Sequence, residues 1–560
     1  MSTGRAEPWP DAMDDPADAP LADDVAALGR LVDAFTAAGF TVDGVADLLG
    51  DDATAALDRD ETVPAELATA AVLARADADA GSRARAALTR LLLLGLPVPA
   101  EAVGADTAAD LVACRLAVDE DRRGEPGGDT VLRSRVDLRP YEADDGTRLW
   151  VAADLGALQT DGPLRHDHVL GIGHASLTLA QVTARRAVET ALDLGTGCGI
   201  QTFHLLRHAR HVTATDLSAR ALAYTRFNLL LNAAALDLDP DDLAARVDLR
   251  QGSLLAPVAG RTFDLIVSNP PFVITPRTAD EDAGARYTYR DGGQAGDRLV
   301  TELIRALPSH LTPGGTAQLL GNWETPRGAD WDETLTAAWF GSADRTDDLA
   351  WWVIQRDTQS PAEYAELWLR DAAQAADPDA YRAAYAVYLA DFAARDVAAV
   401  GFGMIWLRRG DSAGADGAGE GTPAPPLRRM ETLTHAVEQP LGPALAATVA
   451  RHDRVAGLGE AAFSALRLTV AGDVTEERHG TPGAPDPAVI LLRQGAGLRR
   501  SVQTSTALAG FVGASDGDLT AGQIAAALTV LLTPEDPSFA AALLAQVRRA
   551  VVDGFLTVAD

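Results

Sequence analysis

Residues 191–207 read ALDLGTGCGIQTFHLLR, and this stretch decides the fold class of the chain. A short apolar run contains Asp193, a glycine-rich turn follows from Gly195 to Gly199, and a helical pattern begins at Ile200. Glycines lack the Cβ atoms that would keep a ligand away from the backbone, and the first N–H groups of a helix are free to bind. This strand, turn and helix therefore predict a site for a nucleoside held against the backbone.

Strands and helices alternate after this turn. Strands are expected at residues 191–194, 211–215, 247–251, 263–267 and 316–321, with helices at 200–207, 218–232 and 297–307. Such alternation implies a parallel, doubly wound sheet, so the predicted fold class is α/β. Further strands are expected at 349–355, 400–407 and 427–433. We expect the last two to pair as an antiparallel hairpin that closes the sheet.

The glycine turn reads G-x-G-x-G and differs from the G-x-G-x-x-G of a dinucleotide site. Asp193 beside it disfavours a pyrophosphate and favours the ammonium of a methionyl group. Asp216 lies 23 residues later, at the end of the next strand, where a carboxylate can accept hydrogen bonds from both ribose hydroxyls. Ser253, after Gly252, ends the third strand and is placed to reach an adenine edge. The predicted cofactor is S-adenosylmethionine, with binding residues Asp193, Gly195, Thr196, Gly197, Gly199, Asp216, Gly252, Ser253 and Asn269.

The run Ser268-Asn269-Pro270-Pro271-Phe272 follows the apolar strand at 263–267 and suits a planar nitrogen about to be alkylated. The Asn269 side-chain oxygen and the Pro270 carbonyl can each accept an N–H bond from one NH₂ group, which turns the nitrogen lone pair toward an incoming methyl. Two successive prolines fix the backbone, and Phe272 offers a face to a planar base or amide. Asn269, Pro270, Pro271 and Phe272 are therefore the predicted catalytic residues.

Asp193 to Gly199, Asp216 and the N-P-P-F run resemble the class I S-adenosylmethionine-dependent methyltransferases of the N-P-P-[Y/F] branch, over about residues 150–435. The resemblance implies a Rossmann-like sheet of seven strands with an antiparallel last strand. Members include release-factor glutamine methyltransferases and RNA methyltransferases acting on base amino groups. Ser253 departs from the Asp of many members, and residues 325–396 and 410–426 are long insertions relative to a minimal fold.

Composition narrows the possible partners. The formal net charge is −32 and every Lys/Arg position is arginine, so the chain as a whole repels nucleic-acid phosphates. Two cysteines, Cys114 and Cys198, are too few for a disulfide framework or a zinc site. No apolar run is long enough to span a membrane, and no secretory signal is visible, so a cytoplasmic location is expected.

The flanks are expected to be separate domains. We predict a disordered tail at residues 1–20, a helical domain at 21–122 and a β-hairpin connector at 129–160. The helical domain includes helices at 25–35, stopped by Gly39, at 86–94 and at 108–118. The methyltransferase domain would span 161–437, with a mobile loop at 410–426, and a winged-helix-like domain would span 438–560.

Several side-chain groups allow a second interpretation. His166, His168 and His174 match no compact metal site, so we predict no metal and a loop that covers the cofactor. The aromatic stripe at 364–392 is predicted to be core. The pairs Arg499-Arg500 and Arg548-Arg549 are expected to be solvated surface, although they offer contacts to a phosphate-bearing partner.

The acceptor of the methyl group stays open. The segment Tyr289-Arg290-Asp291-Gly292-Gly293 resembles the acceptor side of glutamine methyltransferases and favours a protein glutamine. The alternative is an rRNA or tRNA base, methylated at adenine N6 or guanine N2, with the flanking domains gripping RNA. A third possibility is a cofactor-binding regulator without catalysis. The sequence does not indicate an oligomeric state.

Overall fold

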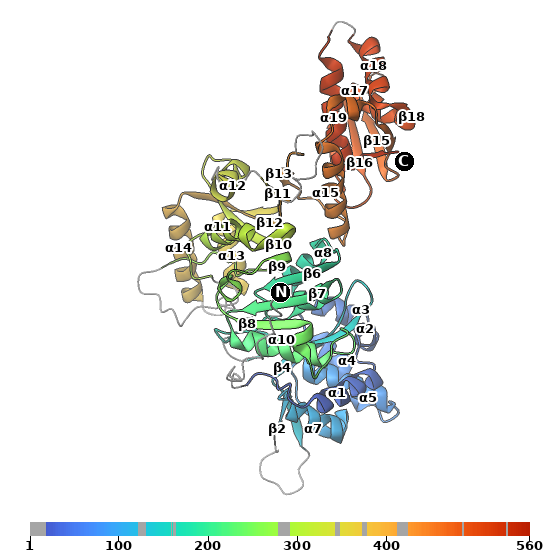
Figure 1. The fold of residues 1–560 in the computed structure, drawn as a ribbon. Coiled ribbons are helices and arrows are strands. Elements are labelled where there is room, and N and C mark those ends of the chain that lie inside the picture. The colour runs from blue at the N-terminus through green and yellow to red at the C-terminus, as the bar shows by residue number, and fades with distance from the viewer. Residues whose placement is uncertain are drawn as a thin grey trace, which may run out of the picture. The chain divides into compact units, whose positions relative to one another are not determined.

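In a computed structural model of the chain, the structure describes residues 18–120, 130–157, 159–160, 164–277, 292–341, 348–371, 378–411, 424–483, 486–533 and 536–559 (Figure 1). Two compact units divide the chain, the first comprising 1–180, 186–341 and 357–403, the second 181–185, 342–356 and 404–560. Most of the tail predicted at 1–20 and of the loop predicted at 410–426 lies outside the described residues.

The first unit begins with short helices. They are α1 (Val25–Ala38), α2 (Val42–Leu49), α3 (Asp51–Leu57), α4 (Val63–Ala74), α5 (Ala80–Leu88), a π-helical turn (Thr89–Leu93), α6 (Ala100–Val103) and α7 (Ala105–Ala113). The Asp24 carboxylate caps α1 by accepting a hydrogen bond from the Ala27 N–H at 2.9 Å. Gly39 ends the helix in the left-handed conformation, at φ 65°, as the sequence predicts.

The helix expected at 108–118 is wrong in its second half. Helix α7 ends at Ala113, Arg115 turns the chain at φ 57°, and strand β2 (Ala117–Glu120) begins. This strand joins β1 (Val98–Pro99) and β3 (Val131–Ser134) in a small sheet of order β1-β3-β2. The predicted connector hairpin is present as β4 (Val136–Glu142) antiparallel to β5 (Arg148–Asp154), with Val136 opposite Asp154.

A Rossmann-like parallel sheet forms the centre of the first unit. Its strands, side by side in Figure 1, are β6 (Val188–Leu194), β7 (Ala209–Asp216), β8 (Val247–Gln251), β9 (Phe263–Ser268) and β10 (Leu311–Pro326). Leu194 at the end of β6 pairs with Thr215 of β7 and with Ser268 of β9. Three strand ends therefore lie level, and the residues that follow them meet at one edge of the sheet.

Helices precede, connect and follow these strands. They are α8 (His174–Val182), α9 (Ile200–Leu206), α10 (Ala219–Leu231), α11 (Arg298–Ala306), α12 (Trp331–Phe340), α13 (Pro361–Asp371) and α14 (Pro378–Ala394). The aromatic stripe predicted to be core packs partly as expected. Tyr364, Tyr388 and Phe392 are buried in one cluster with Ile274, whereas Tyr381 and Tyr385 are only partly buried against it.

The sheet has eight strands in the order β13-β11-β12-β10-β9-β6-β7-β8, so the expectation of seven is wrong in number. The added strands are β11 (Leu349–Gln359), β12 (Val397–Arg409) and β13 (Arg428–Thr432). The predicted hairpin of the last two strands is also wrong. Because β12 lies between β10 and β11, the sheet neighbour of β13 among the described strands is β11, and the two run parallel, with Trp351 opposite Arg428.

The carboxyl-terminal part of the second unit mixes helices with two small sheets. Its helices are α15 (Gly442–Ala456), α16 (Glu460–Ser464), α17 (Thr506–Gly513), α18 (Ala521–Leu532) and α19 (Phe539–Asp553). Its sheets have the orders β18-β14-β19 and β15-β16-β17, with strands β14 (Arg467–Val470), β15 (Val474–His479), β16 (Val489–Gln494), β17 (Ser501–Thr504), β18 (Asp516–Thr520) and β19 (Leu556–Val558). Phe463, Phe511 and Val547 lie in its core. A winged-helix resemblance for this part stays a prediction.

No single described helix is long and apolar enough to cross a bilayer, and the pair α1 and α2, bent by 44°, reaches that length and apolar composition only when the two helices are taken together. Within the same described ranges, no group of three or more His, Cys, Asp or Glu side chains is arranged to hold a metal ion.

Candidate functional site

A cavity of about 410 Å³ opens where β6, β7 and β9 end. Among the predicted cofactor and catalytic residues, those that line it are Gly195, Thr196, Gly197, Asp216, Gly252, Ser253, Asn269, Pro270 and Pro271. The lining does not include Asp193, Gly199 or Phe272. Two motifs that are distant in the sequence therefore meet at one cavity, and the direct roles of Asp193, Gly199 and Phe272 stay predictions.

The glycine turn is held open by backbone geometry. The N–H groups of Gly195 and Thr196 both donate to the Thr215 carbonyl at 2.9 Å, which ties the turn to β7. Gly195 and Gly197 have φ values of 79° and 59°. Side chains rarely tolerate this left-handed region, so glycine is required for conformation even though a Cβ on Gly197 would meet open space.

Asp216 is fixed at the end of β7 by two backbone donors. One carboxylate oxygen accepts from the Gly197 N–H at 3.0 Å and the other from the Ser218 N–H at 2.8 Å. Burial raises the pKa of Asp216 above its usual value, while these backbone hydrogen bonds oppose the rise. Each oxygen keeps capacity for a further donor, so the side chain can still accept from a ligand in the cavity.

Asp193 lies behind the cavity wall. One oxygen of its carboxylate accepts from the hydroxyls of Thr196 and Thr202, each at 2.7 Å. The other oxygen is buried and finds no hydrogen-bond partner among the described residues. Burial raises the pKa of Asp193 to about 6. Its predicted contact with a ligand ammonium stays a prediction, and the observed contacts shape the turn.

The end of β9 carries Asn269 to the same edge. The Ser268 hydroxyl donates to the Leu194 carbonyl at 2.7 Å, which clamps β9 to β6. A Cβ placed on Gly195 would lie 4.0 Å from the main-chain oxygen of Asn269, so the two motifs are in contact distance. The Asn269 side-chain oxygen is buried, and no described residue donates a hydrogen bond to it. A buried acceptor without a hydrogen-bond donor lowers the stability of the folded protein unless a ligand supplies the donor.

Gln294 also lines the cavity, and the sequence reasoning missed it. Its side-chain NH₂ donates to Glu302 at 2.9 Å, and its main-chain carbonyl accepts from Arg277, also at 2.9 Å. The side-chain oxygen is buried and lacks a donor within the described part of the chain. In the sequence, the one signal near Gln294 is the preceding Gly292-Gly293 of the predicted acceptor-side segment. Tyr289 to Asp291 of that segment lie outside the described residues.

One wall of the cavity is the segment from His168 to Gly171 together with His174 to Ser176. Of the three histidines noted in the sequence, His168 and His174 contribute to the lining and His166 does not. Burial lowers the pKa of His168 below its usual value, although the nearby Asp154 carboxylate opposes this effect. A neutral imidazole therefore faces this side of the cavity near pH 7.

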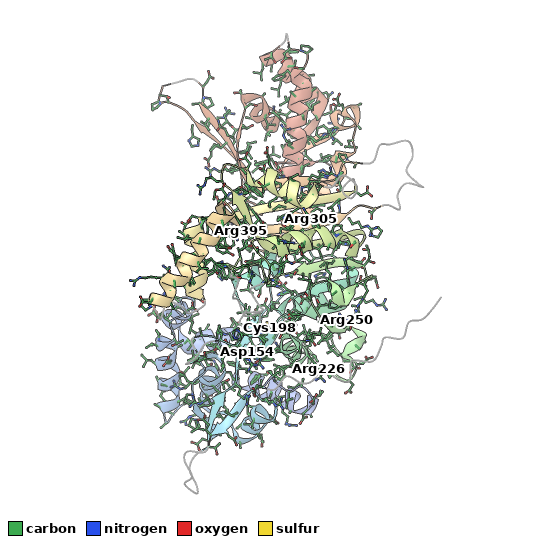
Figure 2. The ribbon with its side chains drawn as sticks, turned by 90° about the vertical axis from the view of Figure 1, so that its left-hand side faces the viewer. Asp154, Cys198, Arg226, Arg250, Arg305 and Arg395 are labelled. Carbon is green, nitrogen blue, oxygen red and sulfur yellow. The ribbon has the colours of Figure 1, made fainter. Side chains whose placement is uncertain are left out.

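Asp154, at the end of β5, anchors this wall (Figure 2). Its carboxylate accepts from the Val169 N–H at 2.8 Å, from the Tyr224 hydroxyl at 2.8 Å and from the Arg220 guanidinium at 2.5 Å. The Asp154 and Arg220 side chains are only 6% and 4% exposed. Their hydrogen bonds hold the pKa of Asp154 below its usual value despite burial. The connector hairpin thus positions the cavity wall.

Two asparagines, Asn228 in α10 and Asn232 at its carboxyl end, also support the connector hairpin and the glycine turn. The Asn228 amide exchanges hydrogen bonds of 2.8 Å with the backbone of Ala152 and donates at 2.9 Å to the carbonyl of Cys198, which is in the glycine turn. The Asn232 amide pairs in the same way with Trp150, at 2.9 and 2.7 Å. Nothing in the sequence singled out these residues, because buried asparagines in a helix carry no local signature.

Two family models match parts of the chain. Residues 37–126 match a domain of unknown function, DUF7059, and residues 170–285 match the methyltransferase small domain. The second match contains the glycine turn, Asp216, Ser253 and the N-P-P-F run. The first covers most of the helices that precede the connector hairpin.

Curated relatives resemble the same region. A ribosomal protein uL3 glutamine methyltransferase of Bradyrhizobium diazoefficiens is 34% identical over 28% of this chain and 46% of the relative. A release factor glutamine methyltransferase of Cereibacter sphaeroides is 40% identical over 24% and 48%. The ribosomal RNA small subunit methyltransferase C of Alcanivorax borkumensis is 30% identical over 24% and 33%. The chain spans about half the length, or less, of these relatives.

Among solved structures, a Thermus thermophilus 16S rRNA N2 G1207 methyltransferase in complex with AdoMet and guanosine is similar at 17% identity. The similarity covers 47% of this chain and 65% of that chain, with a TM-score of 0.25. A methyltransferase from Pyrococcus furiosus matches at 16% identity and a TM-score of 0.23, over 41% of this chain and 80% of that chain.

Proposed function

We propose that residues 170–285, which belong to the methyltransferase small domain family, form the catalytic part of an S-adenosylmethionine-dependent N-methyltransferase. The acceptor is a planar amide or amino nitrogen of a macromolecule, and a protein glutamine is the leading candidate. One observation carries the proposal. Asn269 lines the cavity beside the glycine turn, and its buried side-chain oxygen lacks a hydrogen-bond donor among the described residues.

The residues that line the cavity fit S-adenosylmethionine. A volume of about 410 Å³ lies within the range of ligand pockets, roughly 300–1,000 Å³. The turn at Gly195 to Gly197 exposes backbone, and the fixed Asp216 carboxylate suits the vicinal hydroxyls of a ribose. Gly252 and Ser253 line the side expected to meet the adenine. When bound, this cofactor supplies a methyl group on a sulfonium centre.

Orientation of the nitrogen is the task left to the chain. An amide nitrogen is a poor nucleophile because its lone pair is delocalised. If the Asn269 oxygen and the Pro270 carbonyl accept the two N–H bonds, the lone pair turns toward the methyl group. With the cofactor bound, its sulfonium would supply the methyl group to the nitrogen held by Asn269 and Pro270, and one proton would then leave the nitrogen. No strong general base is needed.

The leading acceptor is a protein glutamine because the N-P-P-F run suits a primary amide and because several curated relatives are named glutamine methyltransferases. An RNA base amino group is the second candidate, since one relative is named a ribosomal RNA methyltransferase. Both acceptors present a planar NH₂ group, so the same two oxygens would serve either one.

The decisive test combines a variant with an acceptor search. Asn269→Ala should lower the rate of methyl transfer by roughly 10²-fold, as expected for losing one preorganised hydrogen-bonding group, while the cofactor Kd stays within about twofold. Asn322→Ala is a matched control, because its buried side-chain oxygen also lacks a described donor but lies outside the cavity lining. Unchanged turnover in Asn269→Ala would remove this residue from the mechanism.

The acceptor is identified with labelled methyl groups in fractionated lysate. A product destroyed by protease supports a protein acceptor, and a product destroyed by ribonuclease supports RNA. Cofactor binding without methyl transfer to any fraction would contradict the enzymatic proposal and favour a regulator that only binds the cofactor.

A further inference from the structure

The second unit holds a cavity of about 550 Å³ that the methyltransferase proposal does not use. Its wall comes from the segment around β13, from α15 and from α19. The charged and titratable residues that line it are Arg428, Arg429, His452, Arg548, Arg549 and Asp553. Four guanidinium groups thus surround one cavity with a single lining carboxylate, in a chain whose formal net charge is −32.

One of the four arginines is neutralised. Arg429 donates to Asp553 at 2.5 Å and to Glu431 at 2.9 Å. Glu431 also accepts from Arg500 at 2.6 Å. Two guanidinium groups and two carboxylates therefore balance within this cluster. The lining carboxylate and Arg429 thus balance each other within this cluster.

Arg548 is oriented by groups that carry no formal charge. Its guanidinium donates to the carbonyls of Val455 and, at 3.0 Å, Leu458, and it lies 4.2 Å from the centre of the Phe463 ring. These contacts fix the side chain and leave its charge uncompensated by them. The guanidinium is thus prepared for an anion at low conformational cost.

Arg428 and Arg549 stand at exposed positions of the same cavity. The Arg428 guanidinium lies over the Trp351 ring, 4.7 Å from the ring centre. This contact restrains the position of the guanidinium group. Arg549 makes no hydrogen bond or ion pair with any residue in the described ranges. It follows Arg548 on α19, so two cations from one helix and one from β13 line the same cavity.

We propose that this cavity binds the phosphate group of a phosphorylated ligand. Guanidinium groups match phosphate oxygens through paired, charge-assisted hydrogen bonds, and a doubly charged anion can engage arginines from two elements at once. A volume of about 550 Å³ leaves room for the group that carries the phosphate. The acidic chain as a whole repels phosphates, so binding of a phosphate needs a local cluster of positive charge such as this one. The pairs Arg499-Arg500 and Arg548-Arg549 therefore differ in the charge they offer to a ligand, because Arg500 already forms an ion pair with Glu431.

Binding is measured on the full chain by calorimetric titration with three probes. They are inorganic phosphate, uridine 5′-monophosphate and a short single-stranded RNA, with uridine as the unphosphorylated control. We expect the phosphorylated probes to bind and uridine not to bind. Tighter binding of RNA with a steep loss at high salt would assign the phosphate to a nucleic-acid backbone, whereas tighter binding of the mononucleotide would assign it to a free nucleotide.

Variants test whether this cavity is the site. Arg428→Ala and Arg549→Ala should each weaken the phosphate Kd by about tenfold, since each removes one charge-assisted contact. Arg499→Ala is the matched control, because this exposed arginine of the same unit does not line the cavity. Both test positions are exposed, and equal melting temperatures would show that the variants stay folded.

Three results would overturn the proposal. They are no binding of any phosphorylated probe to the wild type, equal binding of uridine, and an Arg428→Ala/Arg549→Ala double variant that binds like wild type or no worse than Arg499→Ala. None of these results bears on methyl transfer, because no residue of this cavity lines the first one.

Discussion

Replacing Asp154 by asparagine tests the link between the connector hairpin and the cofactor cavity. The change keeps the size of the side chain and removes its charge, which leaves the Arg220 guanidinium without its carboxylate partner. Because the two side chains are 6% and 4% exposed, water cannot compensate. Breaking a buried ion pair from one side costs about 3–5 kcal/mol, so we expect a loss of this size in the free energy of unfolding.

Asp145→Asn is the matched control. Asp145 also pairs with an arginine, Arg207, at 2.8 Å, but these side chains are 34% and 42% exposed. An exposed pair contributes about 0–1 kcal/mol, so the control should lose little stability. Urea unfolding of both variants gives the difference. Asp154→Asn should also weaken cofactor binding, because Asp154 holds the Val169 N–H in the cavity wall. Equal stability of the two variants together with an unchanged cofactor Kd would refute the reasoning.

The same pair predicts a pH dependence. The pKa of Asp154 is lowered in the folded protein, so its contribution to stability is complete above the unfolded carboxyl pKa of about 4 and is lost as the pH falls through the folded value. The stability gap between wild type and Asp154→Asn should therefore be constant near neutral pH and shrink below about pH 4. A gap that instead widened in acid would show that the charge of Asp154 is not stabilising.

The remaining predictions concern the first cavity. Asp193 has its pKa raised to about 6, so wild type should gain stability relative to Asp193→Asn as the pH falls from about 7 to 4; parallel curves would contradict this. Gly252→Ala places a Cβ 2.5 Å from Pro257 at φ 155°, so the melting temperature should fall. Asp216→Ala should weaken the cofactor Kd by about tenfold or more in calorimetry, and an unaltered Kd would end its ribose role. Gln294→Ala should raise the acceptor KM and leave the cofactor Kd unchanged; the reverse pattern would place Gln294 on the cofactor side.

The features that the sequence predicted are local. The glycine turn at Gly195 to Gly199 needs only its own residues, and Asn269 reaches the same edge because parallel strands of similar register end together. The strand at 247–251 has its expected bounds because the signal is also local: apolar Val247 and Leu249 alternate with polar residues between turns. In such places neighbouring residues carry both the structure and its chemistry.

The features that it missed depend on partners far apart in the chain. Asp154 meets Arg220 across 66 residues and Val169 across 15, so no window of sequence displays the pair. The predicted pairing of the last two strands failed for a different reason. Strands adjacent in sequence often pair as hairpins. Here β12 lies between β10 and β11, so β13 pairs with β11 and not with β12. Gln294 escaped notice because an amide whose oxygen lacks a donor is visible only in three dimensions.

The side-chain amides of Asn228 and Asn232 hydrogen-bond to the backbone at one edge of β5, as the backbone of a neighbouring strand would. A truncated chain that began at residue 161, where the catalytic domain is predicted to start, would lose that edge. It would also leave the buried Arg220 cation without its carboxylate partner. Expression of the catalytic region in isolation should accordingly start no later than about residue 130, and shorter fragments should precipitate or require the hairpin to be supplied as a separate peptide.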